Sequence, residues 1–139
     1  MIIAVFDTNV IYSALYFGGK PLLCLEAVAL SVCRPAVSSE ILAEYEEILS
    51  EAPSRPRLHP DIPKWLIWFR LAAMAVSPSN LGDISSRDVK DNPFLACAIA
   101  ARADFIVSGD DDLLSFENPF AFRIVKPVDF LSHCTARKL

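Results

Sequence analysis

The chain has 139 residues, a hydrophobic fraction of 53% and a mean hydropathy of +0.37. This length suits a single domain over residues 1–139, and this much apolar material excludes a disordered chain. The net charge of −4 and the pI of about 5.1 exclude a protein that coats nucleic acid through bulk positive charge, but not a nucleic-acid enzyme whose acids gather at a metal site.

The first half of the chain predicts two strands, each followed by helices. Residues 2–6, "IIAVF", form a continuous apolar run, which is typical of a strand buried on both faces of a parallel sheet. Helices are expected over 7–17 and, from Pro21, over 21–31. A strand follows over 32–38, and then a helix over 40–50 capped by Ser38 or Ser39.

The second half predicts further alternation. The expected elements are a loop over 52–63, a helix over 64–73 capped by Asp61, a strand over 74–78, a polar loop over 79–91, a helix over 93–103 capped by Asp91 or Asn92, a strand over 104–108, a helical turn over 111–116, a strand over 123–127 and a helix over 128–134. This alternation predicts an α/β fold with a central parallel sheet and helices on both faces.

The sequence also predicts where the protein resides. The two longest apolar runs are interrupted by Glu26 and Arg70, so we expect no membrane contact. The chain reaches Asp7 too soon for a signal peptide, so we expect a cytoplasmic protein. The four cysteines lack CxxC spacing, which predicts reduced, packed thiols rather than a zinc site or disulfides.

Four acidic residues are expected at the carboxyl edge of this sheet, where parallel sheets bind ligands. Asp7 and Asp110 follow strands, Asp91 stands at a helix start, and Glu44 lies one turn into its helix. Such a cluster is unstable as bare anions, so it keeps protons or binds a cation, and its oxygens suit Mg²⁺ or Mn²⁺. A cation held in this way assists the hydrolysis of phosphodiesters.

Each of these acids also has a purely structural explanation. Asp7 and Asp91 are suited to capping the helices that follow them. Glu44 resembles its neighbours Glu46 and Glu47, which suit a solvated helix face, and Asp110 suits a turn after Gly109. Position alone therefore leaves both interpretations open.

Four stretches carry a resemblance to a known family: "AVFDTNVIYSAL", "VSSEILAEYEEIL", "DVKDNPFLACAIAARADFIVSGDDDLL" and "RIVKPVDFL". In this order they resemble the PIN domain, the fold of metal-dependent ribonucleases used by many bacterial and archaeal toxin–antitoxin systems. The resemblance is closest to the branch of toxin components. It implies a three-layer α/β/α, PIN-like fold and a Mg²⁺- or Mn²⁺-dependent endoribonuclease acting on single-stranded RNA, by in-line attack of water with one or two metal ions.

The resemblance also assigns residues. It implies that Asp7, Glu44, Asp91 and Asp110 are the catalytic and metal-binding quartet, and that Asp112 adds a metal ligand. It makes Asn9, Ser108 and Asp88 supporting residues. Asp111 departs from the basic or neutral residue expected there and adds negative charge beside a site that must accept phosphate.

RNA contacts must come from local positive charge. The candidates for phosphate binding are Lys20, Arg55, Arg57, Arg87 and Lys90, although a solvated surface charge explains any single one of them better. The apolar run over 65–69, "WLIWF", indicates either core packing or an interface, and the resemblance favours a homodimer. An antitoxin protein is the other partner that the resemblance implies.

Two other functions compete with the nuclease. "VFDTN" and "GDDD" resemble motifs of haloacid-dehalogenase-like phosphatases, but Asn9 stands where those enzymes need a second Asp. A non-catalytic PIN-like module that binds RNA or protein is the other alternative, although all four quartet positions are filled. The RNA target and toxicity have no signal of their own in the sequence.

Overall fold

The computed structural model describes residues 1–78 and 92–138. Its strands are β1 (Ile2–Phe6), β2 (Cys33–Val37), β3 (Met74–Ala75), β4 (Phe105–Val107) and β5 (Arg123–Val125). Its helices are α1 (Thr8–Phe17), α2 (Gly19–Ala29), α3 (Ser39–Leu49), α4 (Ile62–Ala72), α5 (Asn92–Ala101), α6 (Asp111–Leu114) and α7 (Pro127–Lys138).

The strands form one parallel sheet in the order β3-β2-β1-β4-β5. The central strand, β1, pairs Ala4 with Phe105 and Phe6 with Val107 of β4. Its residues are almost fully buried, as the continuous apolar run predicts for a strand covered on both faces. The sheet therefore confirms the predicted parallel α/β fold.

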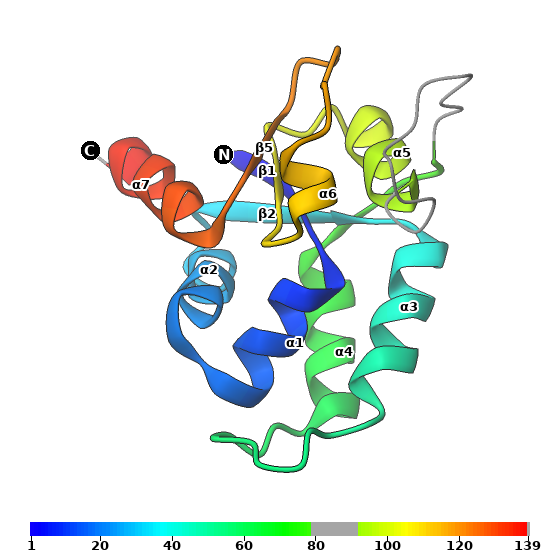
Figure 1. Cartoon of the computed structure of the whole chain (residues 1–139), viewed down its shortest axis with the longest axis vertical. Helices are drawn as coiled ribbons and strands as arrows, with labels where there is room; N and C mark the ends of the chain where they lie inside the picture. The colour runs from blue at the N-terminus through cyan, green and yellow to red at the C-terminus, as the bar shows by residue number, and fades with distance from the viewer. Residues whose placement is uncertain (79–91, 139) are drawn as a thin grey trace.

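The strand order explains the layers. The chain steps from β1 to β2 to β3 on one side of the sheet and then crosses back to β4 and β5. Because such crossovers are right-handed, the helices between β1 and β3 cover one face of the sheet, and α5, between β3 and β4, covers the other. Figure 1 shows α5 across β2 from α1, α2 and α4, and α7 packs against α2. The result is the predicted three-layer α/β/α arrangement.

Several boundaries differ from the sequence prediction. The helix expected from Pro21 begins at Gly19, because Gly18 adopts a φ of 77° that joins α1 to α2 directly. The strand expected over 74–78 is only Met74–Ala75, because β2 ends at Val37, where the chain turns into α3. The closing helix extends through Lys138 rather than ending at 134.

The apolar run of α4 divides between core and surface. Phe69 is fully buried, and Trp65 stacks on it with ring centroids 4.7 Å apart. Ile67 and Leu71 are 62% and 83% exposed. Core packing thus accounts for one side of the helix, while the predicted homodimer stays a prediction.

Two expectations from composition can be compared with the structure. All four cysteines are unbridged and buried, and burial raises the pKa of the Cys97 thiol to about 12. These thiols therefore stay protonated and pack as small apolar side chains. Within the residues that the structure describes, no helix has the length and apolar character needed to cross a membrane.

Candidate active site

The candidate site lies where β1 and β4 end side by side. The strand order reverses between these two strands, because β2 and β3 lie on one side and β5 on the other. The backbone N–H of Asp7, just after β1, donates a 3.0 Å hydrogen bond to the carbonyl of Val107, the last residue of β4. Parallel α/β sheets bind ligands at such a reversal, outside the carboxyl ends of the strands.

A buried serine links two of the predicted acids. The side chain of Ser108 is completely buried, and its hydroxyl donates a 2.7 Å hydrogen bond to Oδ2 of Asp7. The hydroxyl oxygen of Ser108 in turn accepts a 2.9 Å hydrogen bond from the backbone N–H of Asp110. The ends of β1 and β4 are therefore joined through side chains as well as through the sheet.

Asp7 is an acid in an unfavourable place for a charge. It is only 5% exposed, and burial is the main cause that raises the pKa of its carboxyl group. The hydrogen bonds from Ser108 and from the backbone N–H of Asn9 lower this pKa, whereas the negative charges of Asp110 and Glu44 raise it. Asp7 therefore interacts electrostatically with two further carboxylates, which come from two other segments of the chain.

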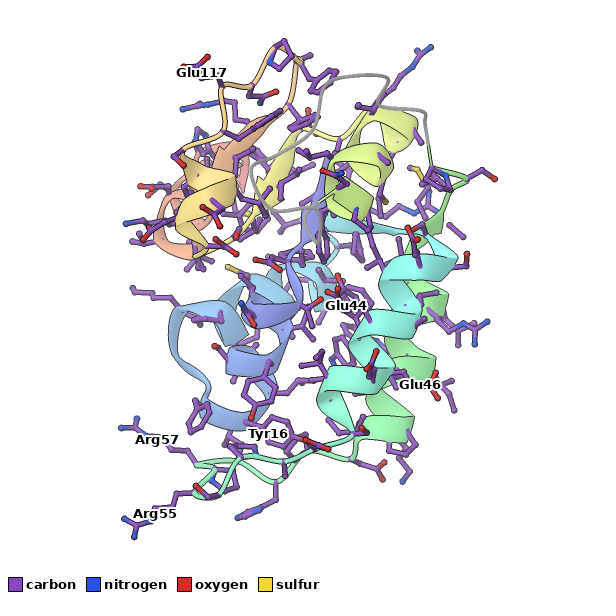
Figure 2. The ribbon with its side chains drawn as sticks, turned by 45° about the vertical axis from the view of Figure 1, so that its right-hand side comes forward. Tyr16, Glu44, Glu46, Arg55, Arg57 and Glu117 are labelled. Atoms are coloured by element: carbon purple, nitrogen blue, oxygen red, sulfur yellow. The ribbon has the colours of Figure 1, made fainter. Side chains whose placement is uncertain are left out.

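Glu44 is held beside the end of β1 by α3. The hydroxyl of Thr8 donates a hydrogen bond to Oε2 of Glu44, which is half-buried. The next residue, Tyr45, is fully buried and donates its hydroxyl to the carbonyl of Phe6. Figure 2 shows Glu44 on the side of α3 that faces α1. These two contacts set the distance of α3 from Asp7.

The acidic run after β4 forms the start of α6. Asp110 caps this helix, and its Oδ1 accepts a 2.8 Å hydrogen bond from the backbone N–H of Asp112. Asp110 and Asp112 are half-buried, whereas Asp111 is exposed. The run thus divides into two acids that lie partly within the fold and one on its surface.

Comparison with known proteins gives the family. The model of the PIN domain matches residues 4–112, which is most of the chain. This chain belongs to the PIN-domain family. Members of this family are generally nucleases, and membership removes the haloacid-dehalogenase-like phosphatases as the family of this chain. No curated protein matches the chain.

Not every predicted site residue of this PIN domain can be placed. Asp7, Glu44, Ser108 and Asp110 converge as described above, and the backbone of Asn9 holds Asp7 while its side chain is exposed. Asp88 and Asp91, together with the phosphate-binding candidates Arg87 and Lys90, lie outside the described residues. Their roles remain predictions.

The other basic candidates lie away from the acids. The loop of Arg55 and Arg57 packs on the far end of α1, where the backbone N–H of Arg57 donates a 2.8 Å bond to the carbonyl of Tyr16. Figure 2 shows both arginines pointing away from Glu44. Lys20 lines a pocket between α2 and α7 with Leu131 and Cys134.

Sequence reasoning missed Thr8 and Tyr45. Thr8 stands between two predicted site residues, Asp7 and Asn9, so its place in the motif is the available signal. Tyr45 carries no such signal, because an aromatic residue at helical spacing indicates only core packing. Both residues act on the site by fixing where Glu44 and Asp7 lie.

The donor chemistry of the site suits a hard cation. The converging side chains of Asp7, Glu44 and Asp110 offer only carboxylate oxygens, which are the ligands of Mg²⁺ and Mn²⁺. Among the residues that the structure describes, no group of three or more His, Cys, Asp or Glu side chains is arranged so that it could hold a metal ion. A cation at this site would therefore need water, substrate or a further side chain to complete its coordination.

Proposed function

We propose that this PIN domain is a Mg²⁺- or Mn²⁺-dependent endoribonuclease that hydrolyses phosphodiester bonds of single-stranded RNA. The observation that supports it best is the Ser108 hydroxyl bridging Asp7 and the backbone of Asp110 at the point where the strand order reverses. Burying the Asp7 carboxylate near the negative charges of Asp110 and Glu44 reduces the stability of the fold, so we expect this arrangement to serve a ligand.

We assign the cation to the quartet Asp7, Glu44, Asp91 and Asp110, with Asp112 as a further ligand. When bound, the cation lowers the pKa of water and neutralises charge on the phosphodiester. The protein's own residues orient the carboxylates. Ser108 and the Asn9 N–H hold Asp7, and Thr8 holds Glu44. These hydrogen bonds keep the ligand oxygens in place before substrate arrives.

The partners and the biological role are also proposals. The resemblance to toxin components supports a toxin with a cognate antitoxin in the cytoplasm. The exposed apolar side chains of α4, Ile67, Trp68 and Leu71, offer a surface for a homodimer. Sedimentation of the purified protein tests the dimer, and growth arrest after induced expression tests toxicity.

The central experiment is RNA cleavage by the purified protein. We expect the wild type to cut single-stranded RNAs of varied sequence in Mg²⁺ or Mn²⁺, and we expect EDTA to stop this cleavage. The variants Asp7→Asn and Asp110→Asn should not cleave RNA, although their unfolding temperatures should equal that of the wild type. Hydrolysis of a phosphomonoester with RNA left intact would contradict a nuclease. RNA binding that is indifferent to EDTA, without cleavage, would favour the non-catalytic binding module.

A further inference from the structure

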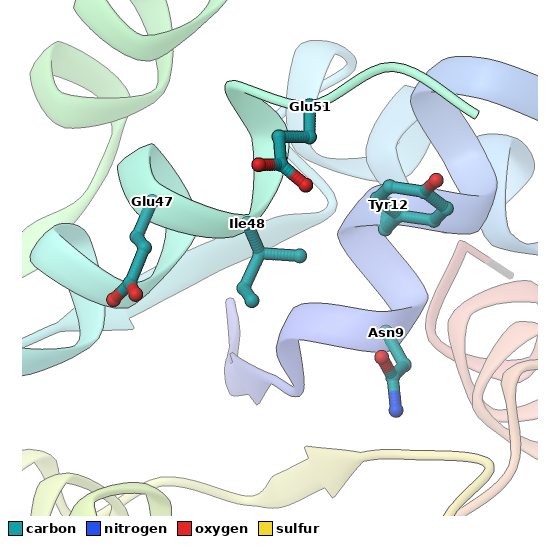
Figure 3. Close-up of a pocket in the computed structure, with 5 residues that line it drawn as sticks. All are labelled: Asn9, Tyr12, Glu47, Ile48 and Glu51. Carbon is teal, nitrogen blue, oxygen red and sulfur yellow. The ribbon is translucent and has the colours of Figure 1, made fainter.

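A pocket of about 360 Å³ opens between α1 and α3, beside the proposed metal site. It is lined by Asn9, Tyr12, Glu47, Ile48 and Glu51. Figure 3 shows these side chains arranged around a common space, with those of α1 on one side and those of α3 and its C-terminal end on the other. No residue of this pocket except Asn9 belongs to the site described above.

The pocket lies one helical turn further along α1 and α3 than the contact between Thr8 and Glu44. Tyr12 follows Thr8 by four residues on α1, and Ile48 follows Glu44 by four residues on α3, so each pair shares a helix face. Thr8 and Glu44 are joined by a hydrogen bond. The pocket therefore begins one helical turn, about 5.4 Å, from that contact, which is within the span of one nucleotide.

The side chains that line the pocket indicate which kind of ligand it can bind. The half-buried ring of Tyr12 and the side chain of Ile48, which is 42% exposed, offer apolar surfaces for a flat group. Glu47 and Glu51 are exposed carboxylates, which accept hydrogen bonds and donate none. They repel a phosphate. The ligand that fits is a flat ring with hydrogen-bond donors on its edge.

We propose that this pocket binds the base of the nucleotide next to the scissile phosphate and that it prefers guanine; this inference rests on the proposed nuclease function. Guanine carries two adjacent donors, N1–H and the N2 amino group, which match the two oxygens of one carboxylate. Adenine and cytosine offer one amino group beside an acceptor nitrogen. Uracil offers one N–H between two carbonyl oxygens, which face the carboxylates unfavourably.

We expect affinity for the base and preference for one base to come from different residues of the pocket. Tyr12 supplies stacking, which every base satisfies, so it contributes affinity without sequence preference. Glu47 and Glu51 supply the discrimination, because only bases with suitable donors satisfy them. The two carboxylates repel the phosphates of the RNA backbone, but they can accept hydrogen bonds from the edge of a base. Recognition of a base edge therefore accounts for the acidic character of the pocket.

The first test measures binding without cleavage. Ligand-detected saturation-transfer NMR with guanosine, adenosine, cytidine and uridine is run on the full chain in EDTA. Guanosine is expected to bind best, and Glu47→Gln or Glu51→Gln to weaken it by roughly tenfold relative to uridine. Glu46→Gln is the matched control, because Glu46 is exposed on α3 two residues from Glu44 and outside the pocket. Tyr12→Ala is expected to weaken all four nucleosides together.

The second test separates the pocket from the nuclease. Single-stranded RNAs that differ only in the base beside one cleavable bond are digested by the wild type and by the glutamine variants. Cleavage with no preference, together with equal binding of all nucleosides, overturns the pocket and leaves the nuclease intact. Guanosine binding that is lost in the glutamine variants, without any cleavage, supports the base pocket and overturns the nuclease.

A cationic ligand is the competing occupant of an acidic pocket. Tri-arginine peptide is therefore titrated in the same NMR experiment. Binding of the peptide that depends on Glu47 and Glu51, with no binding of guanosine, assigns the pocket to a basic protein side chain and overturns the base proposal. Displacement of the bound peptide by guanosine supports the proposal that the pocket binds a base.

Discussion

The Ser108 hydroxyl donates a 2.7 Å hydrogen bond to Oδ2 of Asp7, across the junction between two strands that are a hundred residues apart in sequence. The same hydroxyl oxygen accepts the backbone N–H of Asp110. One buried side chain therefore fixes the relative position of the two acids that follow the central strands.

Replacing Ser108 by alanine is expected to weaken both folding and cleavage. The change leaves the backbone N–H of Asp110 without this partner and removes one of the hydrogen bonds that stabilise ionised Asp7. The expected loss is about 1–3 kcal/mol in the free energy of unfolding, measured by urea denaturation in EDTA. Ser115→Ala, which removes an exposed hydroxyl bonded to a carbonyl, is the control. Equal stability of the two variants would contradict a structural role for Ser108.

Asp7 makes stability depend on pH in a predictable direction. Burial raises the pKa of this carboxyl group above its ordinary value of 3.8, so over the interval between the two values the folded protein keeps a proton that the unfolded chain has released. The free energy of unfolding therefore falls as pH rises through that interval. In Asp7→Asn this contribution is absent, so we expect a flatter pH profile and no loss of stability at neutral pH. Parallel profiles for the two proteins, measured by denaturation in EDTA, would argue against a raised pKa.

Addition of a divalent cation is expected to stabilise the protein through the same carboxylates. A ligand that binds only the folded state raises its stability by about 2.7 kcal/mol at one hundred times its dissociation constant, which is a shift of several degrees in Tm. We expect this shift with Mn²⁺ in the wild type and in Asp111→Asn, and its loss in Asp7→Asn. A shift of the same size in all three proteins would place the cation elsewhere.

The three aspartates after β4 are expected to differ in importance. Asp110 caps α6 and lies nearest to Ser108, Asp112 is half-buried in the first turn, and Asp111 is exposed. Cleavage should fall most in Asp110→Asn and less in Asp112→Asn. Asp111→Asn should lose little or gain, because it removes negative charge beside a phosphate site. Initial rates on one RNA give the order, and a loss in Asp111→Asn as large as in Asp110→Asn would contradict it.

Arg55 and Arg57 are expected to hold the RNA backbone beyond the base pocket. Their loop packs at Tyr16, one turn of α1 further than Tyr12. The double variant Arg55→Ala/Arg57→Ala should weaken RNA binding similarly for all sequences and reduce its dependence on salt. Arg70→Ala, an exposed arginine on α4, serves as the control. A change in base preference, rather than in overall affinity, would show that the arginines do not act as phosphate contacts.

Much of this fold could be predicted because its signals are local. The apolar run of β1, the Ser38 cap of α3 and the Asp61 cap of α4 are each written in a few consecutive residues, and the structure has all three. Because parallel strands end at one edge of a sheet, the sequence also predicts that Asp7 and Asp110 lie close together. The boundary at Gly18 was missed because a helix and its successor can meet at one residue of positive φ without a visible loop.

The sequence by itself therefore determined the class of fold, the family and the edge of the sheet where the acids gather. Only the tertiary structure decided which side chains meet there. The bonds from Ser108 to Asp7 and from Thr8 to Glu44 join residues 101 and 36 positions apart, and the pocket between α1 and α3 exists only because these helices pack together. Local patterns dictate strands and helices because their backbone energetics are local, whereas these contacts depend on the strand order that sets β1 beside β4 and on the packing of α3 against α1.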